Sequence, residues 1–434
     1  MEKITPKFLE SIGIFELREI GREIGVYSPT TLKREALVNK ILDIYEGRTK
    51  PIAKTNRGRP VKILGNTKDI VSSVKTQAEL NYEFDKIDRS LLILREPISS
   101  FDALKSEEDL QCVGILDITI EGYGIVKVKN FSKSDIDAYI PLSLVENYKL
   151  RNGDLVHGIV KSTEKMNTMH TVLAVNDINI ADFKDRKNFE NLTPVYPDKK
   201  IISYNKEDSL RIKSINLVAP IGNGQRAVVF SPKHQKSSLL TELSKNINKT
   251  NKDMEILSLL ISEFPEEVTE IKKSVKGEVV YSTFEESDSN NVLLSELVLN
   301  RGKRLAESGK DVVIFVSNIN ALANAYSIRG ESQNISIKRF FGAARNLEEG
   351  GSLTLILFAS EDDSTEQFLL KELKNINNCE IHLNEDSNLD LIKSNTLKKE
   401  SLLSKAELEV SNRAKNEAKT NLNQAQKIIE NYNG

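Results

Sequence analysis

The stretch "GNGQRAVVFSPKHQKSSLL", residues 222–240, has the order of a strand, a turn and a helix. Its run "AVVF" is short and fully apolar, which is typical of a buried strand. Lys236 and Ser237 follow the turn and begin the helix. This is the layout of a P-loop, G-x-x-x-x-G-K-[ST], whose backbone amides and lysine hold nucleotide phosphates. The stretch predicts a parallel α/β domain with an anion site at a helix N-terminus.

Further apolar runs extend this domain over residues 200–390. They alternate with helix-like segments, which indicates a parallel sheet covered by helices. The predicted strands are "EILSLLI", "EVVYSTF", "DVVIFVSN" and "SLTLILFAS". The last segment, 391–434, is polar and rich in small residues. It predicts a helical tail that contacts a neighbour or only solvent.

A change of pattern marks residues 111–185, which contain short β-rich runs broken by Gly, Asn and Asp. Such spacing predicts a small β-barrel of the OB-fold kind. One predicted strand carries Tyr123, Lys127 and Phe131. Aromatic rings that alternate with cations suit single-stranded RNA, because bases stack on rings and phosphates meet the cations. The spacing is equally compatible with core or rim residues of an ordinary barrel.

The N-terminal part predicts a helical module and a linker. Residues 1–47 have apolar residues at helical spacing and capping residues, which predicts a compact module of small helices. Residues 48–110 form a connecting segment whose start is basic: residues 47–62 hold six basic residues and no acid. Within it, Arg57 and Arg59 belong to Arg-Gly-Arg-Pro, which resembles an AT-hook for the minor groove of DNA. The alternative is a basic tether that contacts DNA or RNA phosphates without selection.

Composition limits the remaining classes of function. The formal net charge is −2, so any nucleic-acid site must be local. The two cysteines and four histidines are scattered, which excludes a zinc site of ordinary spacing and predicts no metal centre of this type. Free thiols, the lack of a signal peptide and the lack of a membrane-spanning run together predict a cytoplasmic protein without a membrane partner.

The longer motifs resemble those of the bacterial transcription termination factor Rho family, over nearly the whole chain. They are "FENLTPVYP" (189–197), "PIGNGQR" (220–226), "PEEVTEI" (265–271), "KGEVVYSTFEE" (276–286) and "KRFFGAARNLEEGGSLT" (338–354). The resemblance implies a helical N-terminal module, a cold-shock-like RNA-binding barrel and a RecA-like ATPase domain in a ring of six copies. It implies single-stranded RNA and the transcription machinery as partners, and ATP with Mg²⁺ as the cofactor.

The phosphate loop departs from the family pattern at one position. The family's A-P-P-K-A-G-K-T matches residues 230–237, so Pro232, Lys233, Lys236 and Ser237 are implied to contact the nucleotide. The glycine is replaced by Gln235. Its side chain is expected to crowd the phosphate path, and a positive φ there would cost about 1 kcal/mol or more. ADP or ATP binding is therefore expected to be weak or lost.

Other departures fall on the hydrolytic residues. The family's metal-supporting aspartate is Ser317 here. Glu263 occupies the position that polarises the attacking water, and is flanked by Ser262 and Phe264 in place of Asp and Arg. The arginine finger corresponds to Leu397 or Lys398, depending on one gap. Neither carries the planar fork that suits a γ-phosphate.

The RNA contacts implied by the resemblance are altered as well. Tyr123 and Phe131 match base-stacking aromatics, whereas Ile125 replaces another. A cytosine-reading turn becomes residues 167–169, and Ser364 takes a basic position of a channel loop.

These features leave three hypotheses. The favoured one is a Rho-like transcription regulator that binds single-stranded RNA, has an inactive motor, and self-associates or assembles with an intact Rho. The alternatives are a functional RNA-dependent ATPase that terminates transcription, and a non-catalytic structural oligomer.

Overall fold

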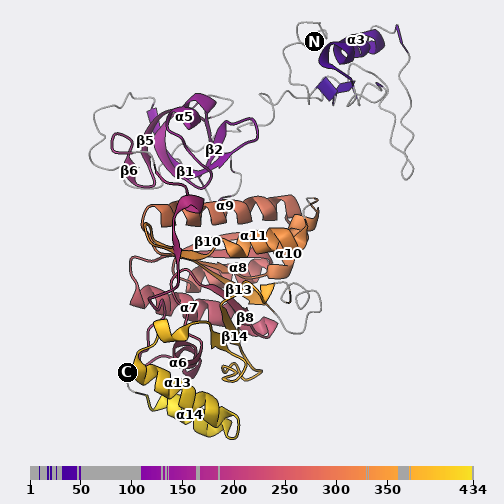
Figure 1. The fold of residues 1–434 in the computed structure, drawn as a ribbon. Coiled ribbons are helices and arrows are strands. Elements are labelled where there is room, and N and C mark those ends of the chain that lie inside the picture. The colour runs from indigo at the N-terminus through magenta and orange to yellow at the C-terminus, as the bar shows by residue number, and fades with distance from the viewer. Residues whose placement is uncertain are drawn as a thin grey trace. The chain divides into compact units, whose positions relative to one another are not determined.

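The computed structural model (Figure 1) describes a small N-terminal part and most of residues 109–432. The described residues are 9, 17, 18, 20, 21, 26, 32–45, 48, 49, 109–128, 131, 134, 136–162, 167–183, 186–328, 330, 332–359, 371 and 373–432. The chain divides into two compact units, residues 1–85 and 86–434. Arg57, Arg59, the basic linker and Ser364 lie outside the described residues.

The first unit contains one described helix, α3 (Arg34–Tyr45). Its Leu37 and Ile41 are fully buried, in a small core that also includes Leu9 and Leu17. The i, i+4 spacing of Leu37 and Ile41 places both on one helix face, as the sequence pattern predicts. The helix lies within the predicted helical module.

The second unit begins with a β-barrel. Its strands are β1 (Asp109–Ile118), β2 (Gly124–Lys127), β3 (Ala138–Ile140), β4 (Leu155–Ser162), β5 (Asn167–Val175) and β6 (Ile178–Asn179), with helix α5 (Leu142–Asn147) between β3 and β4. The strand order is β3-β2-β1-β4-β5-β6, and an extra parallel pairing of β3 with β5 closes the barrel. The predicted OB-like barrel is confirmed.

The larger domain is a parallel sheet between helices. Its strands follow the order β10-β9-β11-β13-β8-β14-β15. They are β8 (Arg226–Phe230), β9 (Glu255–Glu263), β10 (Glu278–Thr283), β11 (Val312–Val316), β13 (Ser352–Ala359), β14 (Cys379–His382) and the antiparallel edge strand β15 (Asn395–Thr396). Two short strands lie off this path: β12 (Arg345–Leu347) pairs with β13, and β7 (Pro194–Val195) pairs with β12. All five runs predicted as strands are strands. The RecA-like class of parallel α/β fold is confirmed.

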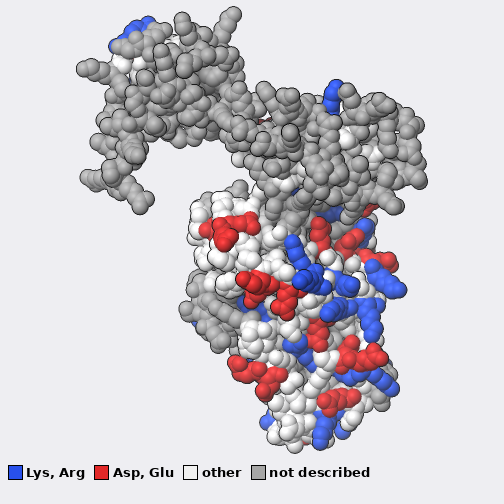
Figure 2. Space-filling model, turned by 180° about the vertical axis from the view of Figure 1, so that it is seen from behind, with Lys and Arg blue, Asp and Glu red and all other residues white. Residues whose placement is uncertain are grey.

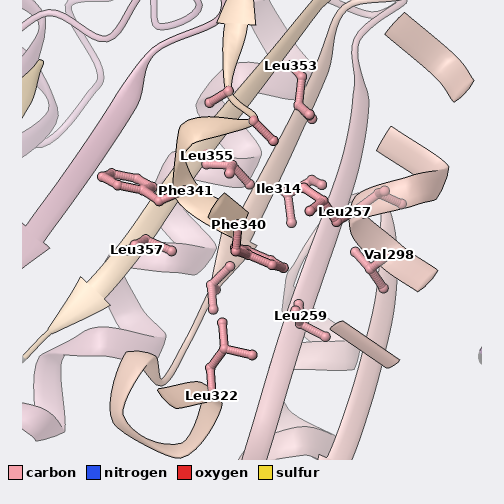
Figure 3. Packing of buried hydrophobic residues seen from close by; sticks show 14 of the residues in the cluster. Leu257, Leu259, Val298, Ile314, Leu322, Phe340, Phe341, Leu353, Leu355 and Leu357 are labelled. Carbon is pink, nitrogen blue, oxygen red and sulfur yellow. The ribbon is translucent and has the colours of Figure 1, made fainter. Parts of the chain in front are cut away.

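Helices cover both faces of this sheet (Figure 1). They are α6 (Leu210–Val218), α7 (Lys236–Thr250), α8 (Pro265–Ser274), α9 (Asp288–Glu307), α10 (Ile319–Ile328) and α11 (Gln333–Gly342). Figure 3 shows Phe340 of α11 near Ile314 of β11, and Val298 of α9 beside Leu257 of β9. Continuous apolar strands are expected in such a sheet, because both faces are buried.

Helix α9 also carries the junction with the barrel. Glu307 is 2% exposed in its side chain and accepts hydrogen bonds from Arg151 Nη2 at 2.8 Å, Arg304 Nη2 at 2.6 Å and the Phe189 amide at 2.7 Å. Gly153, at φ +84°, lies so close to α9 that an added Cβ would be 2.4 Å from the Arg301 nitrogen. Burial of charged groups is favourable only when they are paired in this way, so the junction depends on its ion pairs.

The C-terminal segment differs from the prediction of a single tail that meets only a neighbour or solvent. It forms two helices, α13 (Lys405–Ala418) and α14 (Leu422–Glu430), which pack against α6. Ala414, Ala425 and Ile429 are fully buried there. The small alanines permit close helix packing, which the polar composition of the segment hid.

Within the described residues, no helix has the length and apolar character needed to cross a membrane. Figure 2 shows acidic and basic side chains interspersed over the described face of the second unit. This agrees with a net charge close to zero, and it places any nucleic-acid contact at a local site.

Candidate nucleotide pocket and RNA-binding face

The phosphate-loop residues face a cavity of about 440 Å³ at the carboxyl ends of the strands. Lys236 and Ser237 come from the start of α7, Glu263 from the end of β9, and Ser317 from the residue after β11. The carboxyl ends of parallel strands meet at one edge, which brings these distant residues together. The remaining lining residues are His234, Leu240, Ser262, Phe264, Glu267, Ile271, Asn318, Asn320, Ala321, Asn324 and Phe358.

Gln235 does not have the positive φ expected from the glycine that it replaces. Its φ is −100°, so the expected backbone penalty is absent. The Gln235 amide donates to the Pro232 carbonyl at 3.0 Å, within a short 3-10 turn over Lys233–Gln235. Its side-chain Nε2 donates to the Glu385 carbonyl at 2.9 Å. The Gln235 amide is therefore bonded inside the turn, whereas a phosphate-binding loop would direct this amide at the ligand. The side chain of Lys233 lies outside the described part.

Ser317 and Glu263 form the most direct contact in the cavity. The Ser317 hydroxyl donates to Glu263 Oε1 at 2.5 Å. The pKa of Glu263 is raised to about 7, mainly by burial and in part by the nearby Glu267, against the opposing effects of Ser317 and Lys236. A carboxyl group that holds its proton up to neutral pH is a poor metal ligand, because metals bind the ionised form.

The rim of the cavity is aromatic. Phe264 follows Glu263 directly and is 60% exposed, and Phe284 is 55% exposed. The two ring centroids lie 5.6 Å apart. Ser262, on the other side of Glu263, has φ +53°, and its hydroxyl accepts from the Asn291 side chain at 3.1 Å. Phe264 and Ser262 stand at two positions that are charged in the family pattern. Phe264 is an exposed apolar side chain, and the Ser262 hydroxyl is bonded to Asn291.

The residue at the metal position departs from the family pattern. Mg²⁺ at nucleotide sites usually takes one or two carboxylates together with waters and substrate phosphates. Among the described residues no group of three metal-ligating side chains occurs. The hydroxyl of Ser317 donates to Glu263, so the position that the family pattern gives to a metal-supporting aspartate holds an uncharged side chain. Lys236 and Ser237 keep positions compatible with an anion, whereas the metal support is missing.

The two candidates for the arginine finger have different environments. Leu397 is 61% exposed. Lys398, at φ 56°, places its ammonium 3.2 Å from the centroid of the Tyr196 ring. The Tyr196 ring therefore already attracts the charge of the Lys398 ammonium through a cation–π contact. Neither residue presents a guanidinium.

The barrel presents an aromatic pair, but one of its members was missed in the sequence. Tyr123 and Tyr139 are half-buried, and their ring centroids lie 5.2 Å apart. Tyr139 stands opposite Ile125 in β2 and opposite Thr168 in β5. The alternation of β3, with Ala138 and Ile140 fully buried, turns Tyr139 to the other side. That period of two was the signal that could have found Tyr139.

Phe131 and Lys127 are not on this accessible face, which corrects their predicted role in RNA contact. Phe131 is 2% exposed and belongs to the large buried cluster. Lys127 is 5% exposed, and its ammonium lies 3.6 Å from Asp137 Oδ2. The Asp137 carboxylate also accepts the Val128 amide at 3.1 Å. Both side chains hold the barrel together in this structure.

Comparison with known proteins decides the family. Residues 112–184 match the family description "Rho termination factor, RNA-binding domain". "Transcription termination factor Rho" of Bacillus subtilis (strain 168) is 38% identical over 330 residues, which cover 70% of this chain and 77% of that protein. This chain belongs to the Rho family. The factor of the same name from Allochromatium vinosum is 34% identical over 335 residues, covering 70% of this Rho-family chain and 80% of its relative.

The resemblance read from the motifs is therefore confirmed, and so is the RNA-binding class of the barrel. Within this Rho-family chain two of the altered residues line the same cavity. Ser317 and Phe264 line the cavity, whereas the segment 338–354 supplies buried side chains of α11 and β13. The fold is thus preserved where packing requires it and changed where the chemistry would occur.

Proposed function

We propose that this Rho-family chain binds single-stranded RNA through its barrel and acts on transcription without ATP hydrolysis. The hydrogen bond from Ser317 to Glu263 carries this proposal. Ser317 stands where the family pattern has a metal-supporting carboxylate. Its hydroxyl donates to Glu263, the residue that would polarise the attacking water. Phosphoryl transfer depends on a metal at the β- and γ-oxygens and on a positioned nucleophile, and neither has its residues here.

RNA would bind on the face that carries Tyr123 and Tyr139. Two half-exposed rings at 5.2 Å offer a surface on which bases stack. Ile125 adds an apolar contact in the adjoining strand position. The position of Lys127, paired with Asp137, removes the cation expected to contact phosphates. Stacking is therefore the main contribution to RNA affinity on this face.

Replacing Tyr123 or Tyr139 with alanine tests the RNA-binding face. Each substitution should weaken binding by about 1–3 kcal/mol, the usual contribution of one base-stacking aromatic. Fluorescence anisotropy with a labelled single-stranded oligoribonucleotide measures the change. Ile178→Ala is the matched control, because Ile178 is exposed on β6, at the other end of β5. Unchanged affinity in both tyrosine variants would assign the rings to barrel packing and overturn the proposal for this face.

Co-assembly with an intact Rho is the route by which an inactive motor would affect transcription. The exposed Phe264 and Phe284 support it, since adjacent aromatic rings at a pocket mouth are typical of a surface covered by a partner. Analytical ultracentrifugation of the chain with an intact family member tests this part. Two species that sediment independently, with the chain alone monomeric, would contradict it.

A further inference from the structure

A second cavity, of about 360 Å³, lies beside helix α13, away from the nucleotide pocket. Its lining residues are Ile392, Asn412, Lys415, Asn416 and Lys419. Asn412 and Asn416 are four residues apart on α13, and so are Lys415 and Lys419. Residues at this spacing lie one above the other on a helix face. Two amide and two lysine side chains of α13 therefore line the same cavity.

The hydrogen bonds around this cavity engage the side-chain oxygens of its two asparagines. The Lys399 ammonium donates to Asn412 Oδ1 at 3.3 Å, and Lys419 donates to Asn416 Oδ1 at 3.4 Å. Because each amide oxygen is engaged by a lysine, the amide NH₂ groups are left as donors. Lys415 donates to the Ser394 carbonyl at 2.7 Å, which anchors its ammonium. Lys415 also donates to Asn395 Oδ1 at 3.2 Å. The lining residues thus keep amide and ammonium N–H groups as donors.

The charges at this place are also unbalanced. Among the described residues, no carboxylate forms an ion pair with Lys399, Lys415 or Lys419. The pKa of Lys415 is lowered to about 8, mainly by burial and in part by the charge of Lys399. Two carboxylates lie close by: Glu400 attracts Lys399, and Asp390 accepts the amides of Ile392 and Lys393. The cations nevertheless outnumber the acids around the cavity.

We propose that this cavity binds a phosphate group, presented either by a nucleic-acid backbone or by a small phosphorylated anion. Phosphate oxygens accept hydrogen bonds and carry negative charge, which matches the amide and ammonium donors of the lining residues. The bound anion supplies the counter-charge that the lysines lack. This site is separate from the aromatic face of the barrel and from the phosphate loop.

Titration of the full chain with inorganic phosphate, followed by calorimetry, tests the site. Lys415→Gln should weaken phosphate binding at least about tenfold, because it removes a charged donor. Lys405→Gln is the matched control, since Lys405 is exposed at the start of the same helix and outside the cavity. Lys415→Arg should retain binding. It should also lose the decline that the wild type shows as the pH rises past about 8.

Competition identifies the source of the phosphate. A short single-stranded RNA is added to the Tyr123→Ala protein, so that the barrel contributes less. Displacement of phosphate by the RNA indicates a nucleic-acid backbone, and no displacement indicates a small anion. The proposal is overturned if the wild type binds no phosphate, or if Lys415→Gln and Lys405→Gln bind it equally. Lys419→Gln serves as a second variant should thermal melting show that Lys415→Gln is unfolded.

Discussion

Replacing Glu263 with glutamine is expected to make the protein more stable than the wild type at pH 8, and this advantage is expected to vanish near pH 4.5. Burial raises the pKa of Glu263 from 4.5 to about 7 in the folded protein. The folded state therefore binds this proton more tightly than the unfolded chain does. The favourable contribution is fully present below pH 4.5 and is lost as the pH rises through about 7.

The size of this effect follows from the shift of the pKa. A rise of the pKa from 4.5 to about 7 corresponds to at most about 3.5 kcal/mol. Glutamine keeps the shape and can still accept from Ser317, yet it cannot ionise. Urea unfolding of both proteins between pH 4.5 and 8 measures the difference in free energy of unfolding. A difference that stays constant over this range would show that Glu263 is an ordinary ionised carboxylate.

Replacing Glu307 with glutamine is expected to destabilise the chain by about 3–5 kcal/mol, the usual cost of breaking a buried ion pair. Glu307 is 2% exposed in its side chain and is shared by Arg151 of the barrel and Arg304 of α9. Glutamine leaves Arg304, whose side chain is 7% exposed, without a carboxylate. The same residue also accepts the Phe189 amide, so one change affects both sides of the junction.

Urea unfolding with the matched variant Glu270→Gln measures this cost. Glu270 is exposed on α8, and such surface changes usually remain within about 0.5 kcal/mol. The Glu307→Gln protein should also expose the junction near residue 186 to limited proteolysis before the core of the sheet unfolds. A loss below about 1 kcal/mol would mean that the arginines find other partners or water.

The sheet was predictable because its strands are buried on both faces. Each of β8, β9, β10, β11 and β13 is a short apolar run between turn residues, and a parallel sheet favours this pattern. Helices α13 and α14 were predicted only as helical. Their burial depends on Ala414, Ala425 and Ile429, which stand among polar residues. Periodicity identifies a helix more readily than its packing partner.

The site was predictable in part, since the motif positions name Lys236, Ser237, Glu263 and Ser317, and the structure brings them to one cavity. The hydrogen bond between Ser317 and Glu263 was not predictable, because 54 residues separate them. The φ of Gln235 was predicted wrongly, since the expectation transferred a glycine's conformation to a residue that forms a 3-10 turn.

The barrel residues were harder to assign. Tyr123, Lys127 and Phe131 follow each other on the chain at plausible spacing, yet only Tyr123 is on the accessible face. Which strand face is exposed depends on how the barrel closes, and the pairing of β3 with both β2 and β5 decides it. These two pairings place Tyr139 on the accessible face.

ATP hydrolysis by the purified chain, measured with and without single-stranded RNA, tests the central claim most directly. We predict no RNA-stimulated turnover above the level of the Lys236→Ala variant, and no rescue by Gln235→Gly alone. The reason is that Ser317 would still engage Glu263 and no carboxylate would support the metal. Robust turnover by the unmodified chain that Lys236→Ala abolishes would contradict the account.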